Sequence, residues 1–191
     1  MIRQLRSAPN LLTLARLIFI PFIVIAVLDS RYIWALTLFI VAGVTDGLDG
    51  LLARLLQQKT LLGQYLDPIA DKLLLSTMFL VLSSMHKIPL RVTVLVFSRD
   101  IIILIVCSVL YATGVMKIFR PSVFGKANTL AQIVTVPLVM GREIFHSPWI
   151  VQTTRIAFWT VIGLTIISGV HYVIRVAFDL RSASAKTATG N

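Results

Sequence analysis

The chain has 191 residues, of which 57% are hydrophobic and only 14% charged, and its mean hydropathy is +0.89. Soluble domains have about half apolar and about a quarter charged residues, so this composition indicates an integral membrane protein. The net charge of +10 comes from basic residues scattered over loops, with no basic run interleaved with aromatics, and we expect no nucleic-acid binding. The single cysteine, Cys107, excludes an internal disulfide.

A membrane-spanning helix needs about 20 mostly apolar residues, and six segments approach or reach that length. They lie at residues 10–28, 33–53, 68–86, 91–112, 126–141 and 153–176. We therefore predict an all-α bundle of six transmembrane helices. It forms one domain over residues 1–180, and the polar residues 181–191 are expected to be a disordered tail.

The distribution of Lys and Arg predicts the orientation of this bundle. One set of loops holds only Arg31, Lys87, Arg91, Arg142 and Arg155, whereas the loops on the side of both termini hold more basic residues. By the positive-inside rule both termini are cytoplasmic. We expect a multi-pass protein of a bacterial inner membrane.

The first segment carries polar residues at spacings of three. Asn10, Thr13 and Arg16 fall close to one face of the predicted helix. A helix cap at Asn10 and a snorkelling Arg16 would explain them structurally. Arg16 lies about one turn inside the span, where an unpaired charge is costly, and this favours a role in binding substrate.

Four of the eight acidic residues lie in the short stretch from Asp46 to Asp71. Asp46 and Asp49 are three residues apart, and Asp67 and Asp71 four apart, so each pair occupies one face of a helix. Four carboxylates in an apolar region persist only if they are paired, hydrated or bound to cations, and oxygen ligands select hard cations such as Mg²⁺. The sequence predicts a two-metal site at the cytoplasmic end of this region.

Two such cations clamp a pyrophosphate and neutralise a leaving phosphate, which favours phosphoryl-type transfer. Among four like charges, one carboxylate with a raised proton affinity can act as general base, and we assign this role to Asp71. Asp67 and Pro68 suit the N-cap and first position of the third helix.

These residues form a pattern that resembles the complete signature of the CDP-alcohol phosphatidyltransferase family. The pattern consists of Asp46, Asp49, Gly50, Ala53, Arg54, Gly63, Asp67 and Asp71. The resemblance extends over almost the whole chain, since members share six helices and a similar length.

This resemblance implies specific roles. The four aspartates would hold two Mg²⁺ or Mn²⁺ ions, with Asp71 also the base. The CDP group of CDP-diacylglycerol would be bound by Gly50, Ala53 and Arg54, bordered by Asn10, Thr13 and Arg16. An alcohol would attack the phosphorus that bears diacylglycerol, and CMP would leave. The resemblance also implies that the protein is a homodimer.

Further basic residues are candidates for binding a phosphate on the acceptor alcohol. Arg99, deep in the fourth segment, suits bidentate binding of phosphate, with Asp100 as its orienting partner, although an internal ion pair is the structural alternative. Arg120 and Lys126 flank the start of the fifth helix, where anions bind favourably. Lys126 belongs to a Gly-Lys-x-x-Thr element similar to one in members with phosphate-bearing acceptors. A positive-inside anchor is the alternative.

The acceptor itself stays open among two leading compounds and, beyond them, inositol phosphate or another alcohol. Glycerol 3-phosphate would give phosphatidylglycerol phosphate, which we favour, and phosphatidylglycerol would give cardiolipin. A small cation transporter would also place acids in spans, but these acids lie near one membrane face and no inverted repeat is visible. No role is assigned to Lys72 or His171, and Asp100 is either the orienting partner of Arg99 or a structural acid.

Overall fold

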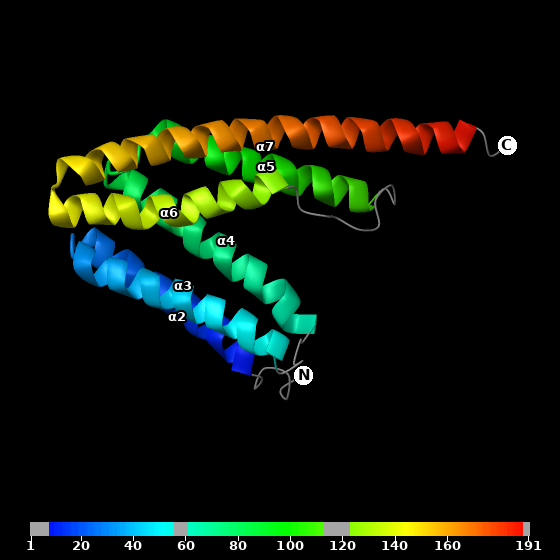
Figure 1. The fold of residues 1–191 in the computed structure, drawn as a ribbon. Coiled ribbons are helices and arrows are strands. Elements are labelled where there is room, and N and C mark those ends of the chain that lie inside the picture. The colour runs from blue at the N-terminus through cyan, green and yellow to red at the C-terminus, as the bar shows by residue number, and fades with distance from the viewer. Residues whose placement is uncertain (1–7, 56–60, 113–122, 189–191) are drawn as a thin grey trace. The chain divides into compact units, whose positions relative to one another are not determined.

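The computed structural model describes the backbone of residues 8–55, 61–112 and 123–188, and the side chains of residues 13–45, 69–106 and 123–174. All regular structure in these ranges is α-helical (Figure 1). The helices are α2 (Ala8–Leu28), α3 (Tyr32–Leu55), α4 (Leu61–Ser84), α5 (Leu90–Ala112), α6 (Val123–Phe145) and α7 (Pro148–Ala188).

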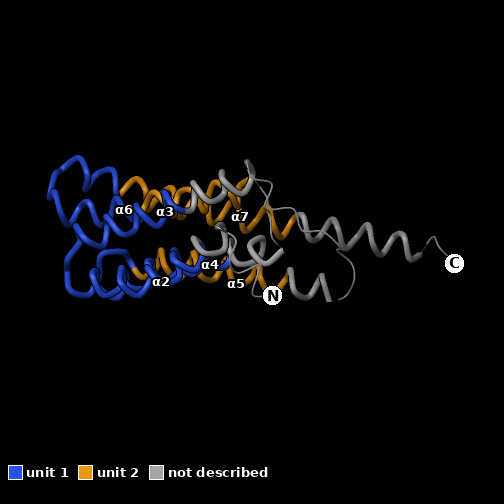
Figure 2. Tube along the Cα trace, turned by 90° about the horizontal axis from the view of Figure 1, so that it is seen from below, with its two compact units in different colours: residues 1–89, 136–154 blue, residues 90–135, 155–191 orange. Residues whose placement is uncertain are grey.

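The chain forms two compact units, coloured separately in Figure 2. Unit 1 comprises residues 1–89 and 136–154, and unit 2 comprises residues 90–135 and 155–191. Helices α6 and α7 each contribute to both.

In unit 1, α2 packs against α3 and α4. The fully buried residues of these helices range from small to large, and they include Val27 of α2, Ala35 and Ala42 of α3 and Phe79 of α4. Alanines at a spacing of seven let a neighbouring helix approach closely, as small residues do between helices in membranes. The opposite face of α2 exposes large apolar residues at helical spacing, Ile18, Phe22 and Ile25. Such a face suits contact with lipid.

Three short turns in unit 1 share one conformation. Ser30, His86 and His146 follow or end a helix with φ values of 56°, 57° and 48°. Such left-handed residues at helix C-termini let the next amides bond back to the last carbonyls. After α2, for example, the amide of Arg31 donates to the carbonyl of Ala26 at 2.8 Å. The helices therefore end without a glycine.

Ion pairs and hydrogen bonds of charged residues connect the turn after α4 to the end of α6. Lys87 donates to Glu143 at 2.5 Å, and the guanidinium of Arg142 donates to the Lys87 carbonyl at 3.1 Å and to Glu143 at 3.0 Å. The ammonium of Lys87 also lies 5.7 Å from the ring centre of Tyr32. The hydrogen bond to Glu143 raises the pKa of Lys87 above its usual value.

The predicted helices are all present, and their bounds differ most at two ends. Helix α4 begins at Leu61, so Asp67 and Pro68 lie inside it, and the prediction of Asp67 as N-cap is wrong. Helix α7 continues to Ala188, through most of the segment 181–191 that was expected to be disordered. Residues 189–191 lie outside the described part.

Two helices of the described chain are long and apolar enough to cross a membrane, Val123–Phe145 and Pro148–Ile174. Within α2 and α3, the parts whose side chains are described, Thr13–Leu28 and Tyr32–Thr45, are also apolar but shorter than a full span. Six transmembrane spans stay a prediction.

Candidate functional site

The acidic stretch lies on two helices of unit 1. Asp46 and Asp49 are on the last turns of α3, and Asp67 and Asp71 are on α4. Because both spacings fall within a continuous helix, each pair of aspartates shares one helix face, as predicted. The side chains of Asp46, Asp49 and Asp67 lie outside the described residues, as do those of Gly50, Ala53 and Arg54.

Asp71 is the predicted ligand whose side chain is described. It forms an ion pair with Arg16 of α2. The Arg16 side chain is 2% exposed and that of Asp71 is 45% exposed. Arg16 therefore turns inward to the acidic stretch, which differs from the snorkelling alternative.

Helix α2 brings a second predicted residue to the same face. Thr13, one turn before Arg16, is fully buried. Asn10 lies within the first turn of α2, and its side chain is outside the described part. The spacing of three between these residues does place them along one side of α2. Of the three predicted residues on α2, Arg16 is thus the one that contacts the acidic stretch, through Asp71.

The chemistry of Asp71 fits a hard divalent cation. In the ion pair it acts as an anion, it keeps nearly half of its side chain accessible, and Asp67 lies one turn before it on α4. Carboxylate oxygens are the ligands that Mg²⁺ and Mn²⁺ prefer. Among the described residues no group of three or more His, Cys, Asp or Glu side chains is present, because three of the predicted ligands lie outside them.

Arg99 of α5 lies within unit 2 and is 14% exposed. It donates to the Asp100 carboxylate at 2.9 Å and to the hydroxyl of Ser168 on α7. Asp100 is therefore the ion-pair partner of Arg99, and a role of this pair in binding an acceptor stays a prediction. The link to Ser168 also joins α5 to α7, so Arg99 has a structural role whatever it binds.

Arg99 lines a cavity of about 420 Å³ in unit 2. The walls come from α5 and α7 and are mainly aliphatic, with Ser98 and Thr165 as polar neighbours of Arg99. Such a space suits a hydrocarbon chain better than a small polar alcohol.

The remaining predicted acceptor residues are only partly described. Lys126 lies in the first turn of α6 and is exposed. The hydroxyl of Thr129 donates to the Gly125 carbonyl at 3.2 Å, which fixes the turn that carries Lys126. Arg120 lies outside the described residues. His171, left without a role, lies with its ring centre 5.2 Å from that of Phe124.

A set of buried polar residues in unit 2 was missed from the sequence. Asn128, Gln132, Thr165 and Ser168 are each at most 2% exposed. The sequence does contain a pattern that indicates them. Asn128 and Gln132 are four residues apart, and Thr165 and Ser168 are three residues apart, in otherwise apolar helices. Polar groups at helical spacing within a span indicate an inward face.

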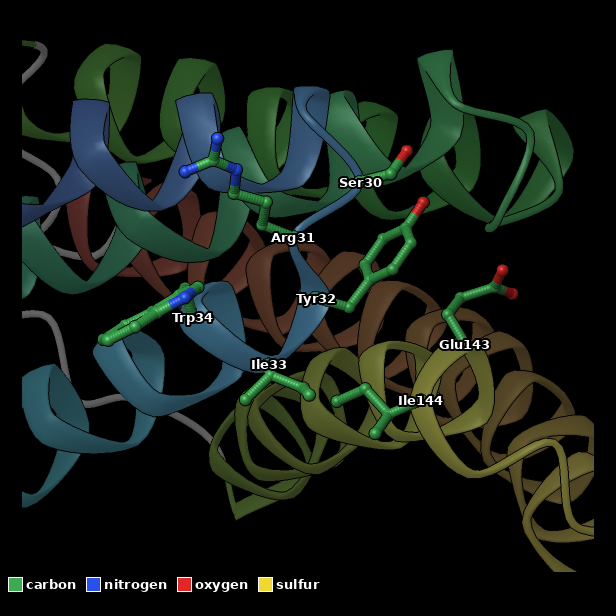
Figure 3. Close-up of a pocket in the computed structure, with 7 residues that line it drawn as sticks. All are labelled: Ser30, Arg31, Tyr32, Ile33, Trp34, Glu143 and Ile144. Atoms are coloured by element: carbon green, nitrogen blue, oxygen red, sulfur yellow. The ribbon is translucent and has the colours of Figure 1, made fainter.

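A cavity of about 610 Å³ in unit 1 holds none of the predicted site residues (Figure 3). Its walls come from the start of α3 and the end of α6, with Tyr32 and Glu143 on one side and Arg31 and Trp34 on the other. The acidic residues lie toward the other end of α3.

Comparison with known proteins gives three findings. The family model described as CDP-alcohol phosphatidyltransferase matches residues 6–169. The chain is 30% identical over 181 residues to the CDP-diacylglycerol–glycerol-3-phosphate 3-phosphatidyltransferase of Bacillus subtilis, covering 87% of this chain and 93% of the relative. It is 33% identical over 181 residues to the protein of the same name from Salmonella choleraesuis, covering 91% and 97%.

A second group of relatives is longer than this chain. Similarity to the cardiolipin synthase (CMP-forming) of Rattus norvegicus is 33% identity over 156 residues, which covers 73% of this chain and 52% of the relative. The chain thus spans about half the length of that protein.

Proposed function

Because the chain belongs to the CDP-alcohol phosphatidyltransferase family, we propose that it transfers the phosphatidyl group of CDP-diacylglycerol to glycerol 3-phosphate. Enzymes of this family are membrane-bound and use CDP-diacylglycerol and an alcohol acceptor. The products here are phosphatidylglycerol phosphate and CMP. Supporting this acceptor, the alignment covers 93% and 97% of two bacterial relatives named for it, but 52% of a cardiolipin synthase.

In the proposed reaction a hydroxyl oxygen of the acceptor forms a bond to the phosphorus that bears diacylglycerol. The bond from that phosphorus to the oxygen of CMP breaks, and CMP leaves with the electron pair. The proton of the attacking hydroxyl passes to the Asp71 carboxylate. Arg16, paired with Asp71, supports this step because it holds that carboxylate in place. It would also border the CDP group.

Two divalent cations, Mg²⁺ or Mn²⁺, held by Asp46, Asp49, Asp67 and Asp71 would neutralise the charge that builds on the departing CMP. Gly50, Ala53 and Arg54 on the last turns of α3 would line the CDP site, with Asn10 and Thr13 of α2 bordering it. Arg99, Arg120 and Lys126 would bind the phosphate of the acceptor.

The six helices would cross the membrane, with both termini and the acidic stretch on the cytoplasmic side of a bacterial inner membrane. The exposed apolar faces of the helices support this arrangement. We also propose that the protein is a homodimer.

A second candidate is a cardiolipin synthase, with phosphatidylglycerol as acceptor. The observation in its favour is the aliphatic cavity beside Arg99, which offers space for a lipid chain next to a phosphate-binding group.

One experiment separates these candidates. The purified protein in detergent is given CDP-diacylglycerol and Mg²⁺ with glycerol 3-phosphate or phosphatidylglycerol in separate reactions, and CMP and the lipid product are measured. We expect phosphatidylglycerol phosphate from the first reaction and no CMP after chelation with EDTA. Cardiolipin from the second reaction alone would replace our proposal with the second candidate, and CMP from neither would overturn both.

A further inference from the structure

Asn128, Thr165 and Ser168 of the buried polar set of unit 2 take part in two hydrogen bonds at one face of α7, whereas the Nε2 atom of Gln132 has no partner among the described residues. Thr165 of α7 donates to the side-chain oxygen of Asn128 of α6 at 3.1 Å. Ser168, three residues further along α7, accepts from Arg99 of α5. Residues three apart lie side by side on a helix, with Cβ atoms about 5–6 Å apart. The amide of Asn128 and the guanidinium of Arg99 are therefore bound by two side chains of α7 that lie one turn apart.

This arrangement leaves hydrogen-bonding capacity unused at Asn128. The side chain is fully buried, and its Nδ2 atom has no partner among the residues that the structure describes. A buried polar atom without a partner costs about 1–3 kcal/mol. If the amide were rotated by 180°, its oxygen instead of its nitrogen would lack a partner. A hydroxyl can pair with either atom, because it both donates and accepts.

Arg99 and Asn128 together match a short alcohol that also carries a phosphate. A guanidinium binds phosphate oxygens, and an amide binds a hydroxyl. In a glyceryl phosphate the secondary hydroxyl is on the carbon next to the esterified one, so phosphate and hydroxyl are separated by a few bonds. Thr165 and Ser168, which bind Asn128 and Arg99, are one helical turn apart, and this spacing suits that separation.

We propose that Asn128 binds the secondary hydroxyl of a glyceryl acceptor whose phosphate lies at Arg99, and so determines acceptor specificity. This inference rests on the proposed function. Thr165 holds the Asn128 amide, and Ser168 is a positioning residue for Arg99. The secondary hydroxyl is not the attacking group, so Asn128 recognises the acceptor without taking part in bond formation. Free glycerol 3-phosphate and the headgroup of phosphatidylglycerol share this chemistry.

The test compares each acceptor with its analogue that lacks the secondary hydroxyl. The probes are glycerol 3-phosphate against 3-hydroxypropyl phosphate, and phosphatidylglycerol against phosphatidyl-1,3-propanediol. Binding to the full-length protein in nanodiscs with Mg²⁺ and CMP is measured by calorimetry, and kcat/KM is measured with CDP-diacylglycerol. We expect the wild type to prefer the hydroxylated member by about tenfold or more, because a site built for a hydroxyl rejects the analogue without it.

Two variants locate the source of this preference. Asn128→Leu is expected to reduce the preference to about onefold, whereas Gln132→Leu, a matched change of a buried amide one turn along α6, is expected to keep it. If Asn128→Leu does not fold, Thr165→Val preserves the shape of the core and removes the hydroxyl that holds Asn128, and it should lower the preference too.

The outcomes separate this inference from the proposed function. Transfer to glycerol 3-phosphate without any preference over its analogue would overturn the inference and leave the function intact. A preference confined to the lipid pair would replace the proposed acceptor and support the role of Asn128. Loss of preference in Gln132→Leu but not in Asn128→Leu would overturn the assignment, and a wild type that binds neither acceptor would overturn both.

Discussion

The ion pair between Arg16 and Asp71 is the residue-level feature on which the proposed reaction most directly depends. It connects α2 to the acidic stretch and gives Asp71 a fixed position. Two substitutions test the two sides of this pair.

Asp71→Asn should lower the rate of CMP release by at least about 100-fold, since loss of a general base costs that much and loss of a metal ligand adds to it. Asp67→Asn should behave alike. CMP release is measured on purified protein, with thermal unfolding to show that the variants fold. Asp29→Asn, on the exposed turn after α2, is the control and should retain activity. Substantial turnover by either variant would contradict the two-metal assignment.

Arg16→Leu should lower kcat/KM for CDP-diacylglycerol by about 10- to 100-fold, because a charge-assisted hydrogen bond contributes about 1.5–3 kcal/mol. The KM for the acceptor should change little. The control is Arg155→Leu, an exposed arginine of α7. A variant that unfolds at a lower temperature but keeps its KM for CDP-diacylglycerol would show that Arg16 is structural alone.

At the scale of helices, the sequence predicts where each element lies but not how it is turned toward its neighbours. Hydrophobic length located all six helices, since apolar stretches end where polar loops begin. The start of α4 was missed because Asp67 and Pro68 are good starting residues, yet residues 61–66 have no helix breaker but Gly63. The extension of α7 is consistent with the three alanines, one arginine and one lysine among residues 181–188, because these residue types favour helix.

The pairing of side chains between helices was only partly predictable. The spacing of Asn10, Thr13 and Arg16 indicated an inward face, but the partner of Arg16 depends on the rotation of α4 against α2. The same holds for Thr165 with Asn128 and for Ser168 with Arg99, since these bonds join residues distant in the sequence. The ion pair between the adjacent residues Arg99 and Asp100 does not depend on such a rotation, and it is present.

The link between Lys87 and Glu143 leads to a prediction about stability. Glu143→Gln should lower the free energy of unfolding by about 1–2 kcal/mol, because Lys87 and Arg142 lose their charged acceptor. Since folding raises the pKa of Lys87, its contribution is complete below the ordinary lysine pKa of about 10.4 and is lost as the pH rises through the raised value.

The difference in the free energy of unfolding between the wild type and Glu143→Gln should therefore be constant from neutral pH to about pH 10. It should become smaller above that pH. Thermal unfolding in detergent over this range measures it. A difference that stays constant at higher pH would assign the effect to Arg142 instead of Lys87.

For the whole molecule, the prediction to be tested is the number of membrane crossings. In a background with Cys107→Ser, single cysteines at Asp29 and His146 should react with an impermeant maleimide added to intact cells. A cysteine at Ser184 should react only after the membrane is opened. This pattern follows from the positive-inside rule. Labelling of Ser184→Cys in intact cells would contradict a cytoplasmic C-terminus.

The left-handed turns at Ser30, His86 and His146 also bear on how the protein is made. Each turn closes a loop of only a few residues, and short loops cost little entropy to close. A helix leaving the ribosome can thus join its predecessor before the rest of the chain exists. Lengthening or stiffening one of these turns would then show first as slower insertion and faster degradation of the nascent protein, before any loss of activity in the molecules that mature.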